Sequence, residues 1–250
     1  MSSAEAIRLS AKDIVAGYGE APVVRKISLS VTGGDVLVVV GPNGAGKSTM
    51  LKAMLGLLRV RSGSVELSGR DITNRPLEEI SRLGVGYVPQ SEDVFDTLRV
   101  IENLEMGGFT LSRKVRSERI EAVLEIFPHL KGRLTRFAGS LSGGERKMVA
   151  VARVLMPDPD ALLLDEPTAG LSPQLTATVL DEQVRLLASL GKAVLVVEQK
   201  AEAALKVADY AAVLVSGEVV LAGTGKEILT HPEVGEVFLG GRPRGATTAP

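Results

Sequence analysis

The chain has 250 residues, of which 45% are hydrophobic and 24% charged, and its formal net charge is −1. This length allows one large domain with a substantial apolar core, and the balanced charge argues against a general nucleic-acid-binding protein, which needs an excess of Lys and Arg to neutralise phosphates. The absence of cysteine excludes disulfides, thiolate catalysis and cysteine-ligated metals.

Neither a secretory signal nor a membrane span is expected. The start, MSSAEAIRLS, lacks a basic segment followed by an apolar run. No apolar run approaches the roughly 20 residues that cross a bilayer, and the longest, YAAVLV at 210–215, has the length of a strand. Any membrane role is therefore expected to come through a partner.

The first predicted elements are strands with one buried face. Apolar side chains alternate with polar ones at Ile7, Leu9 and Ala11, and again over 27–31. A period of two residues is typical of half-buried strands. The segment VELSG at 65–69 is a further predicted strand.

A phosphate-binding loop follows the next strand. The apolar run at 36–40 precedes GPNGAGKST at 41–49, and a helical pattern covers 47–58. This is the G-x-x-x-x-G-K-[ST] loop in its strand–loop–helix setting, where backbone N–H groups and the helix N-terminus surround phosphate oxygens. We expect Lys47 to reach the β- and γ-phosphates of a nucleotide and Ser48 to bind Mg²⁺. The predicted nucleotide-binding residues of the loop are Gly41, Pro42, Asn43, Gly44, Ala45, Gly46, Lys47, Ser48 and Thr49.

The middle of the chain, about 91–140, carries no strong strand signal. The segment SRKVRSERIEAVLEIF has apolar residues at helical spacing, and seven Lys and Arg occur against three acidic residues between 111 and 137. One interpretation is a solvated amphipathic helix. The other is a small helical subdomain whose surface meets another protein, and the residues themselves leave both open.

A second anion site is predicted at LSGGE. Ser142 and Glu145 have the spacing of a capping box, which explains a helix start but not the two glycines, Gly143 and Gly144. Two bare N–H groups beside a hydroxyl at the positive end of a helix form an anion site. Because the phosphate loop already covers one side of a nucleotide, we expect this site to serve a γ-phosphate held by another copy.

Two acids end the predicted strand ALLLD at 161–165. In open α/β sheets, ligands bind at the carboxyl ends of the strands. Asp165 is expected to hold Mg²⁺, directly or through water, and Glu166 to polarise the attacking water as a general base.

Strands and helices alternate through the rest of the chain. The continuous apolar runs at 36–40, 161–165 and 193–197 are typical of parallel strands covered by helices on both faces. Helical patterns occur over 143–155 and 174–190. This alternation favours an α/β fold with a parallel sheet.

The order of these motifs resembles the ATP-binding cassette (ABC) ATPases, over most of the chain. LSGGE stands between the phosphate loop and LLLDE, as the signature of that family does. The resemblance implies an α/β P-loop NTPase (RecA-like) core with a mostly parallel sheet, an N-terminal antiparallel β subdomain and a helical subdomain at about 91–140. It also implies a single domain over 1–240, ahead of a tail at 241–250 predicted to be disordered, and head-to-tail pairing that sandwiches two ATP molecules. The absence of a guanine-reading Asn-Lys-x-Asp segment counts against a GTPase, and the resemblance implies an ATPase.

The family pattern assigns roles to four further positions. Tyr18 is expected to stack on adenine, and Gln90 to act as a Mg²⁺ ligand and as the hinge to the helical subdomain. Gln199 stands at the switch position, where a histidine is usual, and is expected to contact the γ-phosphate without carrying charge. Ser172 replaces a common aspartate and weakens the expected contact across the dimer. These departures predict slow or asymmetric hydrolysis.

Within that family, the segment from LSGGERKM to AGLSP, then VVEQ, is similar to an ATP-binding subunit of branched-chain amino-acid importers, in which glutamine at the switch is usual. Urea or short-amide uptake is the alternative.

The resemblance implies ATP and Mg²⁺ as cofactors. It also implies integral-membrane permease subunits, a second ABC ATPase subunit and, indirectly, an extracytoplasmic solute-binding protein as partners, without nucleic acid. The expected location is peripheral, on the cytoplasmic face of the inner membrane. Two rival hypotheses are a soluble cassette acting on DNA or ribosomes and a non-hydrolysing regulatory cassette.

Overall fold

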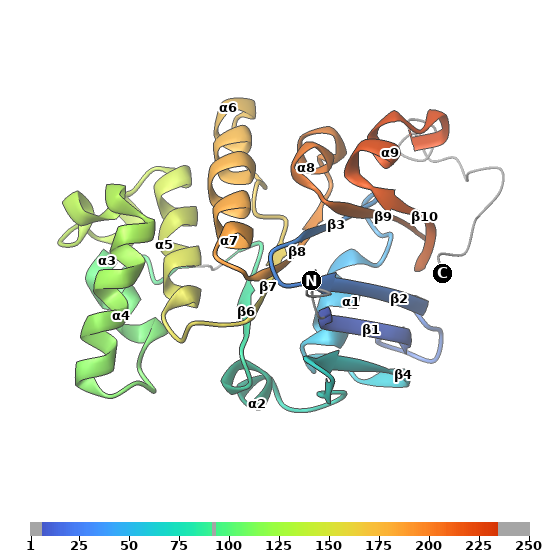
Figure 1. Ribbon diagram of the computed structural model, residues 1–250, viewed down its shortest axis with the longest axis horizontal. Coiled ribbons are helices and arrows are strands. Elements are labelled where there is room, and N and C mark those ends of the chain that lie inside the picture. Colours follow the sequence, from blue (N-terminus) through green and yellow to red (C-terminus); the bar gives the residue numbers. More distant parts are fainter. Residues whose placement is uncertain (1–6, 92–93, 235–250) are drawn as a thin grey trace, which may run out of the picture.

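The computed structural model describes residues 7–91 and 94–234, which form two β-sheets with helices on both sides of the larger one (Figure 1). The smaller sheet is antiparallel, with strand order β2-β1-β4-β5, and the larger has the order β10-β9-β3-β8-β7-β6. The strands are β1 Ile7–Ala16, β2 Val24–Thr32, β3 Val36–Val40, β4 Val60–Leu67, β5 Arg70–Asp71, β6 Val85–Val88, β7 Ala161–Asp165, β8 Ala193–Glu198, β9 Tyr210–Val215 and β10 Glu218–Thr224.

The larger sheet is parallel except at one edge, where β10 joins antiparallel to β9. Its central strands β3, β7 and β8 are buried throughout. Side chains alternate along a strand, so Val36 and Val38 enter one apolar core while Leu37 and Val39 enter the other. Burial on both faces explains why these strands are continuous apolar runs, and the predicted mostly parallel core is confirmed.

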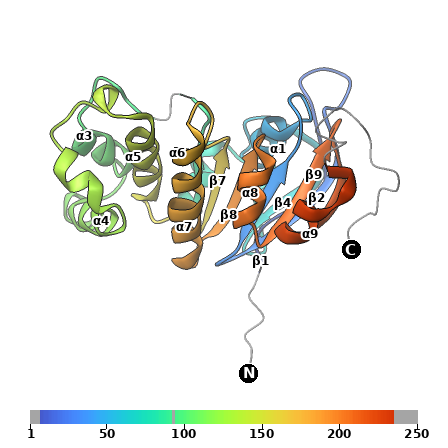
Figure 2. The ribbon, with the colours of Figure 1, turned by 90° about the horizontal axis from the view of Figure 1, so that it is seen from above.

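Helices cover the two faces of this sheet differently. Helix α1 lies between the two sheets and packs Met50 and Leu51 into the core that they share. Helices α5 to α9 line the opposite face (Figure 2). The helices are α1 Lys47–Met54, α2 Leu77–Arg82, α3 Val100–Gly107, α4 Arg113–Ile126, α5 Gly143–Leu155, α6 Pro173–Ala177, α7 Arg185–Ser189, α8 Ala201–Val207 and α9 Gly225–Thr230.

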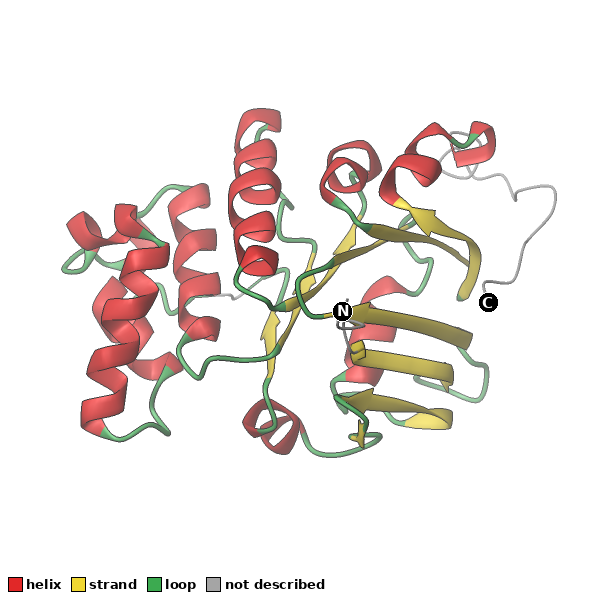
Figure 3. Cartoon of the chain, viewed as in Figure 1, coloured by secondary structure: helices red, strands yellow, loops and turns green. Residues whose placement is uncertain are grey.

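The described part of the 91–140 region is helical, at one end of the molecule (Figure 3). Helices α3 and α4 pack on α5 through Leu104 and Val123. The Arg119 guanidinium donates hydrogen bonds to the carbonyls of Leu155, at 2.8 Å, and Met156, at 3.1 Å, where α5 ends. Helix α4 is thus attached to α5 as well as solvated along its outer face. The division into a domain over 1–240 with a subdomain inside it stays a prediction, and the tail at 241–250 lies outside the described residues.

Three element boundaries differ from the sequence prediction. The helix predicted over 47–58 ends at Met54, because Gly56 takes a left-handed φ of +67° and turns the chain. The strand predicted over 65–69 is β4, which starts at Val60 and ends at Leu67, before a two-residue turn with positive φ at Ser68 and Gly69. The helix predicted over 174–190 contains a π-helical segment, Thr178–Val184, between α6 and α7.

Candidate functional site

The predicted site residues gather at the carboxyl edge of the parallel sheet. Val40 of β3 pairs with Glu198 of β8, and Asp165 of β7 pairs with Val197 of β8. This register brings the phosphate loop after β3, the acids at the end of β7 and the turn after β8 to one edge, where open α/β sheets hold ligands. Gln90, two residues beyond the end of β6, joins them.

The phosphate loop wraps the first turn of α1. Gly46 caps the helix with a left-handed φ of +105°, and a Cβ on Gly41 would lie 2.2 Å from the carbonyl oxygen of Leu214, so neither position suits a side chain. The Lys47 ammonium is buried and donates to the carbonyls of Gly41, at 2.9 Å, and Pro42, at 3.2 Å. The backbone carbonyl oxygens of the loop therefore hold the Lys47 ammonium in place.

Asp165 sits in a small network of hydroxyl groups. Ser48 Oγ donates to one carboxylate oxygen at 3.1 Å, and the Tyr87 hydroxyl lies 3.5 Å from the other. Burial raises the pKa of Asp165, the negative charge of Glu166 raises it further, and the Ser48 hydrogen bond opposes the shift. Burial raises the pKa of Tyr87 to about 12, and the negative charge of Asp165 makes a smaller contribution in the same direction. Tyr87 was not predicted as a site residue.

Glu166 is held from three directions. Its backbone has a left-handed φ of +45°, which costs a non-glycine residue about 1 kcal/mol, and its N–H donates to the carbonyl of Val197 at 2.8 Å. Gln90 Nε2 donates to one carboxylate oxygen at 2.8 Å, and the Lys47 ammonium lies 3.7 Å from the other. The strained backbone aims this carboxylate at the phosphate loop.

The phosphate loop, Gln90 and Glu166 border a cavity of about 480 Å³, a size typical of small-molecule sites, whereas Asp165 is not among its lining residues. Its lining residues are Tyr18, Val23, Asn43, Gly44, Gly46, Lys47, Ser48, Thr49, Gln90, Glu166 and Gln199. Tyr18 is 65% exposed, and the Lys52 ammonium lies 5.9 Å from its ring centroid. Of the predicted loop residues, Gly41, Pro42 and Ala45 are not among the lining residues.

The donor set fits a magnesium ion that shares its ligands with a nucleotide. Mg²⁺ prefers oxygen ligands, usually one or two from protein together with phosphate oxygens and water. Ser48 and Asp165 supply a hydroxyl and a carboxylate side by side. Within residues 7–91 and 94–234, no group of three or more His, Cys, Asp and Glu could hold a metal by itself.

The predicted second anion site lies apart from this cavity. Ser142 accepts from the Glu145 N–H at 3.3 Å, and the Glu145 carboxylate accepts from the Ser142 N–H at 3.0 Å, so the capping box is confirmed. A Cβ on Gly143 would lie 3.1 Å from Leu171 Cδ2, a tight contact. Packing of α5 against the loop after β7 is therefore one reason for a glycine here that sequence reasoning missed.

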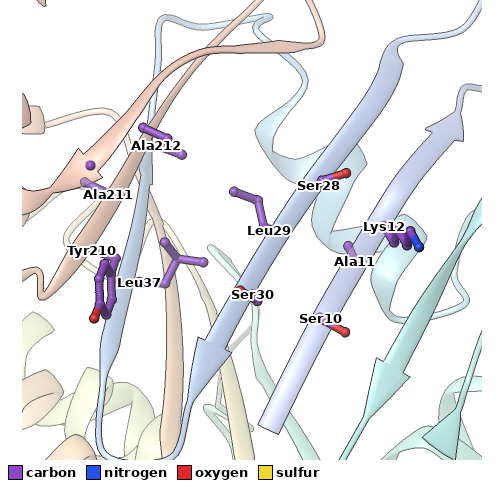
Figure 4. Close-up of a pocket in the computed structure, with 12 residues that line it drawn as sticks. Ser10, Ala11, Lys12, Ser28, Leu29, Ser30, Leu37, Tyr210, Ala211 and Ala212 are labelled. Atoms are coloured by element: carbon purple, nitrogen blue, oxygen red, sulfur yellow. The ribbon is translucent and has the colours of Figure 1, made fainter. Parts of the chain in front are cut away.

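A further cavity, of about 490 Å³, lies between the two sheets, with Ser28 and Leu29 on one wall and Leu37 and Tyr210 on the other (Figure 4). It is lined mostly by small or apolar side chains, and Lys12 is the charged residue among them. None of the predicted site residues borders it.

A phosphate loop between strand and helix, with carboxylates on a neighbouring strand, defines a P-loop nucleotide-binding protein. The ABC transporter family matches residues 24–169, more than half of the chain, and the protein therefore belongs to that family. It is 41% identical to the probable branched-chain amino acid transport ATP-binding protein LivF of Archaeoglobus fulgidus, over 90% of this chain and 95% of the relative. It is also 41% identical to the high-affinity branched-chain amino acid transport ATP-binding protein BraG of Pseudomonas aeruginosa, over 90% and 96%. A third relative, at 37% over 93% and 96%, is the lipopolysaccharide export system ATP-binding protein LptB of Acidithiobacillus ferridurans.

Solved structures agree with this assignment. An ATP-binding cassette of an ABC transporter in its ADP conformation has a TM-score of 0.86 and 29% identity, covering 94% of this chain and 99% of that one. A nucleotide-free cassette has a TM-score of 0.83 and 30% identity, covering 93% and 98%. The chain is thus a nucleotide-binding ATPase of the ABC transporter family. No helix among the described residues is long and apolar enough to cross a bilayer.

Proposed function

We propose that the chain powers the import of branched-chain or related amino acids. Relatives named for branched-chain amino acid transport, at 41% identity over nine-tenths of the chain, carry this proposal. The match to a lipopolysaccharide export protein, at 37%, supports a second candidate, an export ATPase. Uptake of urea or short amides, which the family resemblance also implies, is a third candidate.

The proposed chemistry is hydrolysis of the γ-phosphate by water. Glu166 would take the proton of the attacking water, because its carboxylate projects toward Lys47 and the phosphate loop. Lys47 and the loop N–H groups would hold the phosphates and offset the charge that develops on them. A magnesium ion held by Ser48 and Asp165, with Gln90 as a further candidate ligand, would neutralise charge on the β- and γ-phosphates. The observation that carries the proposed hydrolysis of ATP is the convergence of Lys47, Asp165 and Glu166 at one edge of the sheet.

A complete site would need a second cassette. Ser142, Gly143 and Gly144 do not border the cavity of their own chain. In the proposed dimer they would cover the γ-phosphate bound to the phosphate loop of the other cassette. Gln199 of that other cassette, which borders the same cavity as its phosphate loop, would contact the same phosphate. ATP would favour the closed pair because it binds that state better, and hydrolysis would reopen it.

A permease is proposed to dock in an apolar groove at the base of the helical region. This groove, of about 370 Å³, lies between the α2–β6 segment and α3. Phe95, Met106 and Phe109 border it and are exposed, although large apolar side chains are usually covered. An apolar cytoplasmic segment of a membrane-embedded subunit would cover them, placing the chain peripherally on the cytoplasmic face of the membrane. An external solute-binding protein would deliver the solute to that permease.

The test is solute-dependent ATP turnover by the chain purified with its membrane partners. Reconstituted in vesicles with the solute-binding protein, the complex should hydrolyse ATP faster with leucine, isoleucine or valine than with urea. Stimulation by urea alone, or by lipopolysaccharide, would instead assign the chain to one of the other two candidates.

A further inference from the structure

The two residues that flank Gln199 both form hydrogen bonds to the loop that follows Glu166. Glu198, the last residue of β8, is 2% exposed. One of its carboxylate oxygens accepts from the Thr168 N–H at 2.9 Å and from the Thr168 hydroxyl at 2.7 Å. The other accepts from the N–H of Gln199 at 3.2 Å.

Lys200 reaches the same loop from the other side of Gln199. Its ammonium donates to the carbonyl of Leu171 at 3.0 Å and to the Thr176 hydroxyl at 3.3 Å. The backbone on both sides of Gln199 is therefore fixed to 168–176, the segment that leads away from Glu166. Gln199 itself projects into the nucleotide cavity.

A buried carboxylate in this place needs an explanation. Moving a charge out of water costs several kcal/mol unless hydrogen bonds or an ion pair offset the loss. No ion pair to Glu198 forms among the described residues, so its three hydrogen bonds to Thr168 and Gln199 satisfy it. Charge-assisted bonds are about twice as strong as neutral ones, which makes Glu198 a stiff connection between the two segments.

We infer that Glu198 and Lys200 are positioning residues that hold Gln199 in register with Glu166. The inference rests on the proposed role of Gln199 at the γ-phosphate. A glutamine amide donates a directional hydrogen bond and cannot compensate for a poor angle with charge, as an imidazolium can. Its contribution to turnover therefore depends on how firmly its backbone is held relative to the general base.

The test is a double-mutant cycle on the full chain, with kcat and KM for ATP measured separately. Glu198→Gln should lower kcat roughly tenfold, the equivalent of one hydrogen bond, and leave KM within about twofold. Lys200→Met, at an exposed position, should lower kcat in the same direction. Glu202→Gln, on the exposed face of α8, is the matched control and should leave both constants within about twofold.

The decisive variant is the double substitution of Glu198→Gln with Gln199→Ala. If Glu198 acts through Gln199, the double variant should have the kcat of Gln199→Ala alone. Effects that multiply, or a raised KM with a lowered melting temperature, would overturn the inference while leaving the role of Gln199 intact. A Gln199→Ala variant with normal kcat would instead show that the proposed role of Gln199 is wrong.

Discussion

The Lys47 ammonium lies 3.7 Å from a carboxylate oxygen of Glu166, and the two side chains are only 4% and 14% exposed. The group expected to bind phosphate is thus paired with the group expected to activate water. In the proposed site, a bound γ-phosphate would compete with Glu166 for the Lys47 ammonium, so nucleotide binding would loosen this pair. That exchange would release the carboxylate for catalysis once ATP is in place.

Glu166→Gln should separate ATP binding from hydrolysis. Removing the carboxylate charge beside Lys47 should leave ATP affinity unchanged or higher, while turnover falls roughly 10²–10⁴-fold through loss of the general base. Nucleotide affinity by calorimetry and phosphate release by a coupled assay measure the two effects. Near-normal phosphate release would show that another group is the base.

Asp165→Asn should stabilise the nucleotide-free chain and impair its use of magnesium. Burial raises the pKa of Asp165 in the folded state, so ionising this carboxyl lowers the free energy of unfolding. That free energy is therefore highest below the ordinary pKa of 3.8 and declines as the pH rises through the folded-state pKa. The asparagine variant lacks this loss and should melt about 2–4 °C higher at pH 7, with the difference disappearing at low pH. Turnover with Mg-ATP should fall roughly 10²-fold. A lower melting temperature at pH 7 would contradict the burial cost assigned to Asp165.

Glu145 should stabilise the fold in a defined pH window. The Arg133 hydrogen bond, followed by the Ser142 N–H, lowers the pKa of Glu145 from 4.5 to about 2. The stability it contributes is present above pH 4.5 and is lost as the pH falls toward 2. Glu145→Gln should cost about 1 kcal/mol in urea unfolding at pH 7, because solvent screens the half-exposed Arg133, and should cost nothing near pH 2.

The control for Glu145 is Glu121→Gln, because the Glu121 side chain forms no hydrogen bond or ion pair within the described residues. That substitution should change the free energy of unfolding by less than about 0.5 kcal/mol at either pH. A cost for Glu145→Gln that is the same at pH 7 and near pH 2 would rule out the ionised pair as its source.

Tyr18→Ala should weaken ATP binding about 5- to 30-fold through loss of base stacking, while Tyr18→Phe keeps the ring and should bind normally. Inorganic triphosphate, which lacks a base, should bind all three proteins equally. If the phenylalanine variant is as weak as the alanine variant, the hydroxyl and not the ring makes the contact.

Local motifs predicted the local geometry of several candidate site residues, whose roles stay predictions. The phosphate loop, the adjacent acids after β7 and the capping box each depend on residues close in sequence, so spacing alone indicated their local geometry. The long apolar runs likewise predicted the central strands. Short or irregular elements were missed. Strand β6 has only four residues, an irregularity between Val219 and Leu221 breaks the alternation in β10, and α3 buries the polar side chain of Asn103.

Contacts made through the sheet register could not be predicted. Glu198 follows an apolar run and looks like a solvated strand end, yet the β3–β8 pairing buries it beside Thr168. Lys147 lies on α5 and donates to the carbonyl of Gln90 at 3.1 Å, a contact between residues 57 apart in sequence. The π-helical segment was also missed, because a shifted backbone hydrogen bond leaves the apolar pattern nearly unchanged.

Mixing two inactive variants tests most directly whether each ATP is enclosed by two chains. Glu166→Gln removes the proposed base, and Ser142→Arg should block the anion site offered to the partner. In a mixed pair, one site joins an intact Glu166 from one chain to an intact Ser142 from the other, so ATP turnover should reappear and should fall on dilution. Turnover that stays at the average of the two variants, with unmodified protein working equally well at any dilution, would show that a single chain holds the whole site.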